Sequence, residues 1–156
     1  MKLAKIVSAV LILAMLCCAL MACSGASSED EAVDLPERKL YDITVSFQIK
    51  DSTGKTVIDA VDYNYKGHSE PTILNILSTY LSVVEDWVCK IDKNNTITQI
   101  GGMKANKKNG DYWGFVKGGI NMNKDEIMRN LTDGKMSDTE IEDGGVFTVI
   151  LIVDEG

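Results

Sequence analysis

Residues 146–153 read VFTVILIV, and this stretch decides the fold. It contains eight apolar or β-branched residues in a row, without the alternation of polar and apolar positions that marks a half-exposed strand. A continuous run of this length is typical of a strand that is covered on both faces. Asp143, Gly144 and Gly145 come directly before it and predict a tight turn. We therefore expect the closing strand to be central in its sheet.

The segments before this strand predict the layers around it. Residues 43–49 alternate apolar and polar side chains, and residues 51–54 (DSTG) have the chemistry of a turn, so that 57–65 forms the second strand of a hairpin. Pro71 can open a helix, and apolar residues recur at helical spacing over 73–84. The order of two strands, a helix and more strands predicts an α+β domain with one main helix packed on a mixed β-sheet.

Four further segments complete this interpretation. Residues 87–91 and 96–100 flank a DKNN turn and read as a short strand pair, whereas 112–116 is an aromatic strand that follows a loop. Residues 123–131 predict a short helix.

The N-terminus has the layout of an export signal. Lys2 and Lys5 precede residues 6–22, which are apolar apart from Ser8. Residues 20–23 (LMAC) look like a bacterial lipobox, in which Cys23 is diacylated and becomes the mature N-terminus. Residues 1–22 are thus predicted to be a lipoprotein signal peptide. An uncleaved membrane anchor and an ordinary secreted protein are the alternatives.

The next segment, residues 23–40, is predicted to be a disordered acidic tether. Residues 24–40 contain five acidic and two basic residues and few apolar ones. Loss of residues 1–22 would remove two of the sixteen basic residues and none of the 23 acidic ones, so the net charge would become −9. This charge disfavours nucleic-acid binding. Cys89 would be the one remaining thiol, which excludes an internal disulfide.

The chain contains no catalytic, cofactor or metal motif. There is no GxGxxG, GxxxxGK[ST], HExxH or CxxC pattern, and residues 121–125 (NMNKD) fail the calcium-loop pattern. We therefore expect a binding protein, not an enzyme, with no catalytic residues and no metal site.

Four stretches occur in the order found in a known family. They are PTILNILSTYL (71–81), TITQIGG (96–102), GDYWGFVKGG (110–119) and GKMSDTEIEDGGVFTVIL (134–151). With them the chain resembles a domain family of Gram-positive surface lipoproteins that is similar to the C-terminal domain of transcobalamin and intrinsic factor. The resemblance implies a β-grasp-like domain over residues 41–156. The sequence departs from the family pattern at Lys117-Gly118-Gly119 and at Gly145, and it has about ten extra residues around 123–134.

The resemblance implies a function at the cell surface. The protein would be anchored by its lipid to the outer face of the cell membrane, where it captures a corrinoid such as cobalamin, or a similar ligand, for uptake by a membrane transporter. The chain has no second, helical domain to cover such a ligand, so a partner or a dimer is expected. The alternative is a cell-envelope interaction or adhesion module without a small-molecule ligand.

The ligand-binding residues are expected on and after the aromatic strand. Alternation places Trp113 and Phe115 on one face and Tyr112 and Val116 on the other. Gly114 weakens the strand unless a ligand or a neighbouring ring lies over it. A core position is the favoured interpretation of Trp113, so Tyr112 and the Lys117 turn are expected to be nearer to function. The predicted binding set is Tyr112, Trp113, Phe115, Lys117, Gly118 and Gly119.

Overall fold

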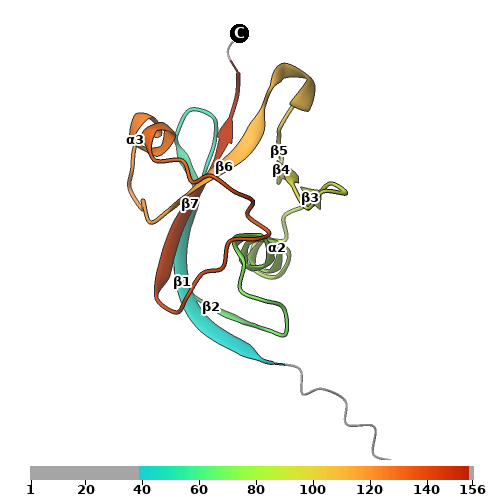
Figure 1. Cartoon of the computed structure of the whole chain (residues 1–156), viewed down its shortest axis with the longest axis vertical. Helices are drawn as coiled ribbons and strands as arrows, with labels where there is room; N and C mark the ends of the chain where they lie inside the picture. Colours follow the sequence, from blue (N-terminus) through green and yellow to red (C-terminus); the bar gives the residue numbers. More distant parts are fainter. Residues whose placement is uncertain (1–38, 155–156) are drawn as a thin grey trace, which may run out of the picture. The chain divides into compact units, whose positions relative to one another are not determined.

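The computed structural model describes residues 39–154 (Figure 1). The predicted signal peptide, the lipidation site Cys23 and most of the predicted tether lie outside these residues. Within the described part of the chain, no helix has the length and apolar character needed to cross a membrane.

A four-stranded mixed sheet forms the centre of the domain. Its strands are β1 (Tyr41–Lys50), β2 (Thr56–Gly67), β6 (Tyr112–Lys117) and β7 (Gly145–Ile152). They lie in the order β2-β1-β7-β6. β7 runs parallel to β1 and antiparallel to β6, whereas β1 and β2 form the predicted antiparallel hairpin. The closing strand is therefore central, and the prediction of a mixed sheet is confirmed.

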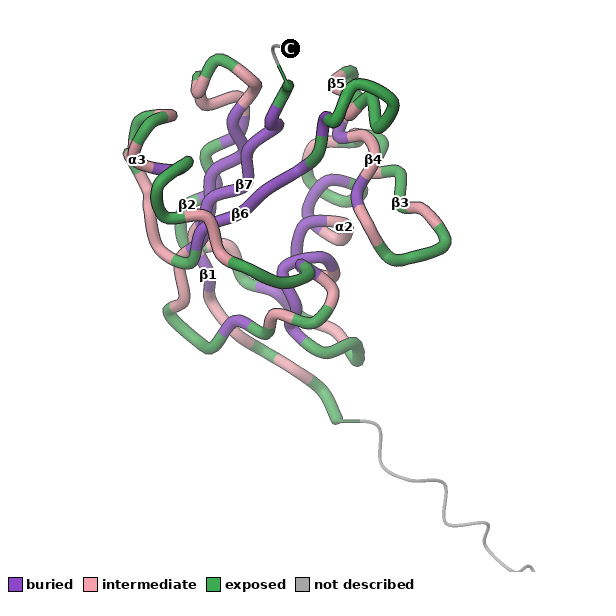
Figure 2. The backbone as a smooth tube through the Cα atoms, turned by 45° about the horizontal axis from the view of Figure 1, so that its top comes forward, coloured by how far each residue is buried: buried purple, intermediate pink, exposed green. Residues whose placement is uncertain are grey.

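One face of this sheet, here called the front face, is covered by α2 (Ile73–Val83), and it carries the main core. Phe47 of β1 and Phe147 of β7 stack with ring centroids 5.0 Å apart, and Tyr80 of α2 meets Phe47 edge-on at 5.0 Å. Thr72 caps the helix, because its side chain accepts a hydrogen bond from the backbone N–H of Asn75. Figure 2 shows the buried backbone concentrated in the main sheet and in α2.

A second, smaller sheet lies beside α2. It consists of β3 (Cys89–Ile91), β4 (Ile97–Ile100) and β5 (Met103–Lys104), and the 3₁₀ helix η1 (Lys107–Asn109) follows it. β3 and β4 are the predicted strand pair at narrower bounds. Gly101 has a φ of +55°, and a Cβ atom there would lie 2.7 Å from the Trp87 ring. Only glycine therefore fits between the small sheet and Trp87.

The opposite face, the back face, is covered by α3 (Lys124–Arg129). Asn123 and Glu126 form a capping box at the start of this helix. Ile127 is fully buried and packs in a small back core with Val116 of β6 and Ile150 of β7. Both faces of β7 are thus covered, as its apolar run predicted. Most of the extra segment 123–134 closes the back face, and only its end reaches the ligand edge expected from the resemblance.

Candidate ligand-binding site

The aromatic residues of β6 divide as alternation predicted. Trp113 and Phe115 are 5% and 3% exposed and belong to the front core, whereas Val116 belongs to the back core. Tyr112 is 45% exposed. Tyr112 is therefore the one aromatic side chain of the strand that is open to solvent over much of its surface.

A cleft of about 220 Å³ lies on the front side of β6, next to Trp113. Its remaining walls come from the turn between β3 and β4 and from a segment before β7. The lining residues are Asn95, Thr96, Ile97, Tyr112, Trp113, Phe115, Gly134, Lys135 and Met136. We call this hollow the front cleft. It brings together three of the predicted binding residues, namely Tyr112, Trp113 and Phe115.

The wall at residues 134–136 is fixed to the start of α2. The backbone N–H of Leu74 donates to the Met136 carbonyl at 3.1 Å, and the N–H of Ile73 donates to the Thr139 carbonyl at 2.9 Å. The first N–H groups of a helix have no partner within the helix, so these bonds satisfy them. This wall is therefore held by the same helix that covers the front core.

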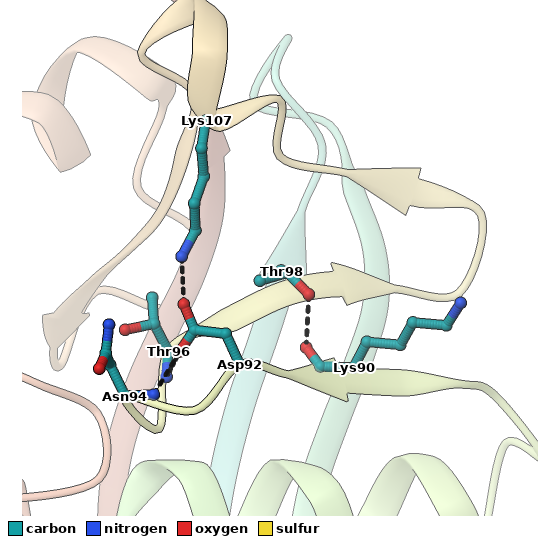
Figure 3. A network of polar contacts seen from close by, with 6 residues as sticks. All are labelled: Lys90, Asp92, Asn94, Thr96, Thr98 and Lys107. Carbon is teal, nitrogen blue, oxygen red and sulfur yellow. Dashed lines mark hydrogen bonds and ion pairs between the residues drawn. The ribbon is translucent and has the colours of Figure 1, made fainter.

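The opposite wall is held by a polar network around Asp92 (Figure 3). One carboxylate oxygen of Asp92 accepts hydrogen bonds from the backbone N–H groups of Asn94 and Thr96, at 2.9 and 3.0 Å. The other oxygen accepts a hydrogen bond from the Lys107 ammonium group of η1. The bond from Lys107, followed by those from the turn, lowers the pKa of Asp92 to about 2. Asp92 thus stays ionised and shapes the turn that presents Asn95 and Thr96.

Trp113 carries an unsatisfied polar group. Its indole Nε1 is buried and has no hydrogen-bond partner among the described residues. Buried polar atoms are nearly always paired, so an orphan donor beside a cleft is unusual. Trp113 therefore carries one donor that the described residues do not satisfy.

The remaining predicted binding residues lie at the far end of β6. Lys117 lines a different hollow, and its Nζ donates to the Glu140 carbonyl at 3.3 Å. Gly118 and Gly119 follow with φ values of +81° and +83°, and form the turn out of the strand. Tyr112 and Lys117 are five residues apart, which is about 16 Å along a strand. The structure therefore does not bring the Lys117 turn to the front cleft.

Gly114 is explained by packing within the domain. A Cβ atom at this position would lie 2.8 Å from the Ile152 side chain and 2.9 Å from that of Leu131. The ring of Tyr112 is 3.5 Å away. The space over Gly114, which the sequence left for a ligand or a ring, is thus filled by the chain's own side chains.

Sequence reasoning missed the residues of the two cleft walls. Asn95, Thr96, Lys135 and Met136 belong to turns and loops, and their residue types do not mark a site. The DKNN turn was recognisable as a turn, but nothing in the sequence placed it opposite Trp113. Among residues 39–154 no group of three or more His, Cys, Asp or Glu side chains is placed to hold a metal ion.

Comparisons with known proteins give similarity at the level of the fold. No protein-family model and no curated protein matches the sequence. The crystal structure of haptocorrin in complex with Cbi matches with a TM-score of 0.52 and 14% identity, over 77% of this chain and 27% of haptocorrin. A Ruminococcus gnavus protein provisionally described as metal-binding matches with a TM-score of 0.46 and 11% identity, over 71% of this chain and 97% of that one.

The chain therefore spans about a quarter of the length of haptocorrin, a protein of the transcobalamin family. This similarity agrees with the expected resemblance to transcobalamin at the level of the fold alone.

Proposed function

We propose that this protein binds a corrinoid such as cobalamin, or a similar ligand, at the front cleft. The observation that carries this proposal is the gathering of Tyr112, Trp113 and Phe115 around a cleft next to an unpaired buried indole N–H. Ligand sites are typically apolar hollows with a few well-placed polar groups, and the front cleft has this composition. The fold shared with haptocorrin, which was crystallised with Cbi, supports the same ligand class.

We also propose that the domain has a β-grasp-like fold. The β1–β2 hairpin, the helix α2 that follows it, and the parallel pairing of β1 with β7 support a β-grasp-like domain. In this arrangement β6 is an edge strand of the main sheet.

The domain would cover one side of its ligand. The front cleft has a volume of about 220 Å³, whereas hollows that enclose a drug-sized ligand span about 300–1,000 Å³. A corrinoid would therefore insert one edge between Trp113 and the walls and leave its other side open. A partner protein or a second copy of the chain would cover that side.

The proposed location follows from the N-terminal sequence. A lipid on Cys23 would hold the domain on the outer face of the cell membrane, and the acidic segment 23–40 would act as a tether. The protein would then hand its ligand to a membrane transporter. Labelling of cells with radioactive palmitate tests the anchor, because a Cys23→Ala variant should not be labelled.

The binding proposal is tested with the purified full chain in detergent. Gel filtration with cyanocobalamin, cobinamide and haem, followed by visible absorbance, should show co-elution of at least one corrinoid. Tyr112→Ala and Trp113→Phe should weaken this binding, whereas Trp87→Phe, which lies outside the cleft, should not. The proposal fails if no corrinoid co-elutes at high micromolar concentration.

A second candidate is the envelope interaction module, and one observation favours it. Val83, Val84 and Val88 are 75%, 54% and 53% exposed at the end of α2 and just beyond it. Three exposed valines within six positions offer apolar surface to a protein partner. A pull-down from envelope extracts should then recover the same partner with the unchanged chain and lose it with Val83→Ser/Val84→Ser. Deletion of residues 123–134 is unsuitable as a test, because it would remove Ile127 from the back core.

A further inference from the structure

Other segments of the chain form hydrogen bonds with the outer edge of β6 at two points, and we call these two points closures. The Phe115 carbonyl accepts a hydrogen bond from the backbone N–H of Thr132 at 2.8 Å, and the Lys117 N–H donates to the Thr132 hydroxyl at 3.3 Å. Just before the strand, the Asp111 N–H donates to the Asn106 carbonyl at 3.2 Å. Along a strand, the backbone groups of successive residues face the two neighbouring sides in turn. The even-numbered residues of β6 hydrogen-bond to β7, so the N–H and carbonyl groups of its odd-numbered residues face the outer edge.

Trp113 lies between these two closures and has the same parity. Its backbone N–H and carbonyl therefore point to the outer edge, and the structure gives neither of them a partner among residues 39–154. Trp113 as a whole residue is only 5% exposed. Its indole Nε1 is also unpaired. One buried residue thus has two donors and one acceptor without partners, although buried backbone groups are nearly always paired.

Hollows lie on both sides of this gap. The front cleft is one, and a second hollow of about 260 Å³ is lined by Leu131, Thr132, Asp133 and Gly134 together with residues 112–115. Tyr112, Trp113, Phe115 and Gly134 line both. A small group can therefore approach the Trp113 backbone from either side of the strand.

We propose that this gap is an amide-recognition site. The ligand's amide N–H would donate to the Trp113 carbonyl, and the ligand's amide carbonyl would accept from the Trp113 backbone N–H. A donor and an acceptor on one residue are the pattern that an antiparallel strand presents to a single partner residue. The inference rests on the proposed function and narrows its ligand class to small molecules that carry amide side chains on an apolar body. Corrinoids with amide side chains fit this class, whereas haem, which carries carboxylates, does not.

The length of the gap favours a small molecule over an added β-strand. Strands in proteins usually span 3–10 residues, but here the closures by Asn106 and Thr132 leave a single outward-facing residue with both groups unpaired. A polypeptide that followed the edge would meet the closing segments at both ends. One amide group at the end of a side arm fits between them.

The first test needs no ligand. Amide hydrogen exchange on the full chain in detergent should show the Trp113 N–H exchanging faster than those of Gly114 and Val116, which face β7. Protection of the Trp113 N–H equal to theirs would mean that it is already paired, and would overturn the inference.

The second test uses matched probes. 3-Phenylpropanamide, which carries a single amide group, is titrated against methyl 3-phenylpropanoate, which keeps the carbonyl but has no N–H donor, while the backbone and indole signals of Trp113 are followed by NMR. The amide should move the Trp113 backbone signal and bind roughly two- to tenfold more tightly, the worth of one net hydrogen bond. Equal binding of the two probes, or an unmoved Trp113 signal, would contradict the proposal. A five-residue extended peptide that binds far more tightly than either probe would show a strand-addition site instead.

Corrin probes separate this inference from the proposed function. Cobinamide should bind more tightly than the same corrin whose amides are replaced by methyl esters. Equal binding of both corrins leaves the corrinoid function standing and removes the amide site. Binding of the small amide probe without binding of either corrin would support the amide site and contradict the corrinoid function.

Discussion

The two faces of the main sheet carry hydrophobic cores of different size. The front core combines α2, the small sheet and the front side chains of four strands, and its aromatic residues stack and meet edge-on around Phe47. The back core has four buried residues, Val116, Ile127, Ile150 and Ile152, under a helix of six residues. Polar groups complete the back face, since the Thr148 hydroxyl donates to the Gly119 carbonyl at 3.0 Å.

This difference places the larger core and the front cleft on the same side of the main sheet. The front core holds the domain together, and the walls of the front cleft are extensions of it, through Met136 on one side and the Asp92 turn on the other. The back core shields β7 and positions the segment that ends at Thr132, which closes the edge of β6. Four measurements test this division, from the largest expected effect to the smallest.

Ile76→Ala should have the largest effect. Ile76 is fully buried in the front core, and truncation of such a residue leaves a cavity, so the free energy of unfolding should fall by about 4 kcal/mol. Urea denaturation followed by circular dichroism measures the change. Val83→Ala, at a position that is 75% exposed on the same helix, is the control and should change the free energy of unfolding by less than about 0.5 kcal/mol.

Ile127→Ala makes the same change on the back face. Ile127 is also fully buried, but a helix of six residues can settle into the cavity, so we expect a loss of about 2 kcal/mol. Hydrogen exchange should rise in α3 and remain unchanged in α2. A decrease in the free energy of unfolding as large as that of Ile76→Ala would show that the two cores contribute equally to stability.

Asn123→Ala tests whether the back helix depends on its cap. The Asn123 side chain accepts from the Glu126 N–H at 3.0 Å, and the Glu126 carboxylate accepts from the Asn123 N–H at 2.9 Å. Loss of this capping box should cost about 1 kcal/mol in the free energy of unfolding. Thr72→Ala, the matching change at the start of α2, is the comparison. Exchange in α3 should increase only in the Asn123 variant.

Acid should act on the front cleft through Asp92. The pKa of this carboxyl is lowered from 3.8 to about 2, so its contribution to the folded turn is complete above about pH 4 and is lost as the pH falls through about 2. The NMR signals of the Asn94 and Thr96 amides should therefore titrate with a midpoint near pH 2. In an Asp92→Asn variant these signals should not titrate in this range. A midpoint near 3.8 in the unchanged chain would contradict the role of Lys107.

Local patterns in the sequence predicted much of the fold. Alternation over residues 43–49, helical spacing over 73–84 and the apolar run 146–153 identify β1, α2 and β7, because burial on one or both faces leaves a periodic mark in the sequence. The parallel pairing of Val45 with Gly145 leaves no such mark, since it joins residues far apart in the chain. Asp62 lies at a bulge in β2 and has a φ of +51°, a conformation that Asp tolerates, but nothing in the sequence marks at which residue of the strand the bulge lies.

The candidate site was predictable only along one strand. The aromatic cluster pointed to β6, and alternation placed its side chains correctly, but the walls of the cleft come from turns that the fold brings together. The unpaired groups of Trp113 depend on where Asn106 and Thr132 stop closing the edge. Hydrogen bonds that are absent cannot be recognised in a sequence, because they depend on the final position of every neighbouring segment.

The pairing of β1 with β7 also sets the order in which the domain can fold. The first strand of the described domain finds one of its two neighbours only in the last strand. A chain that emerges N-terminus first therefore keeps one edge of β1 open until residues 145–152 have emerged, and contacts of such long sequence separation form slowly. During that interval the open edge can pair with another chain, so a protein truncated before β7 should aggregate and not fold into a smaller domain.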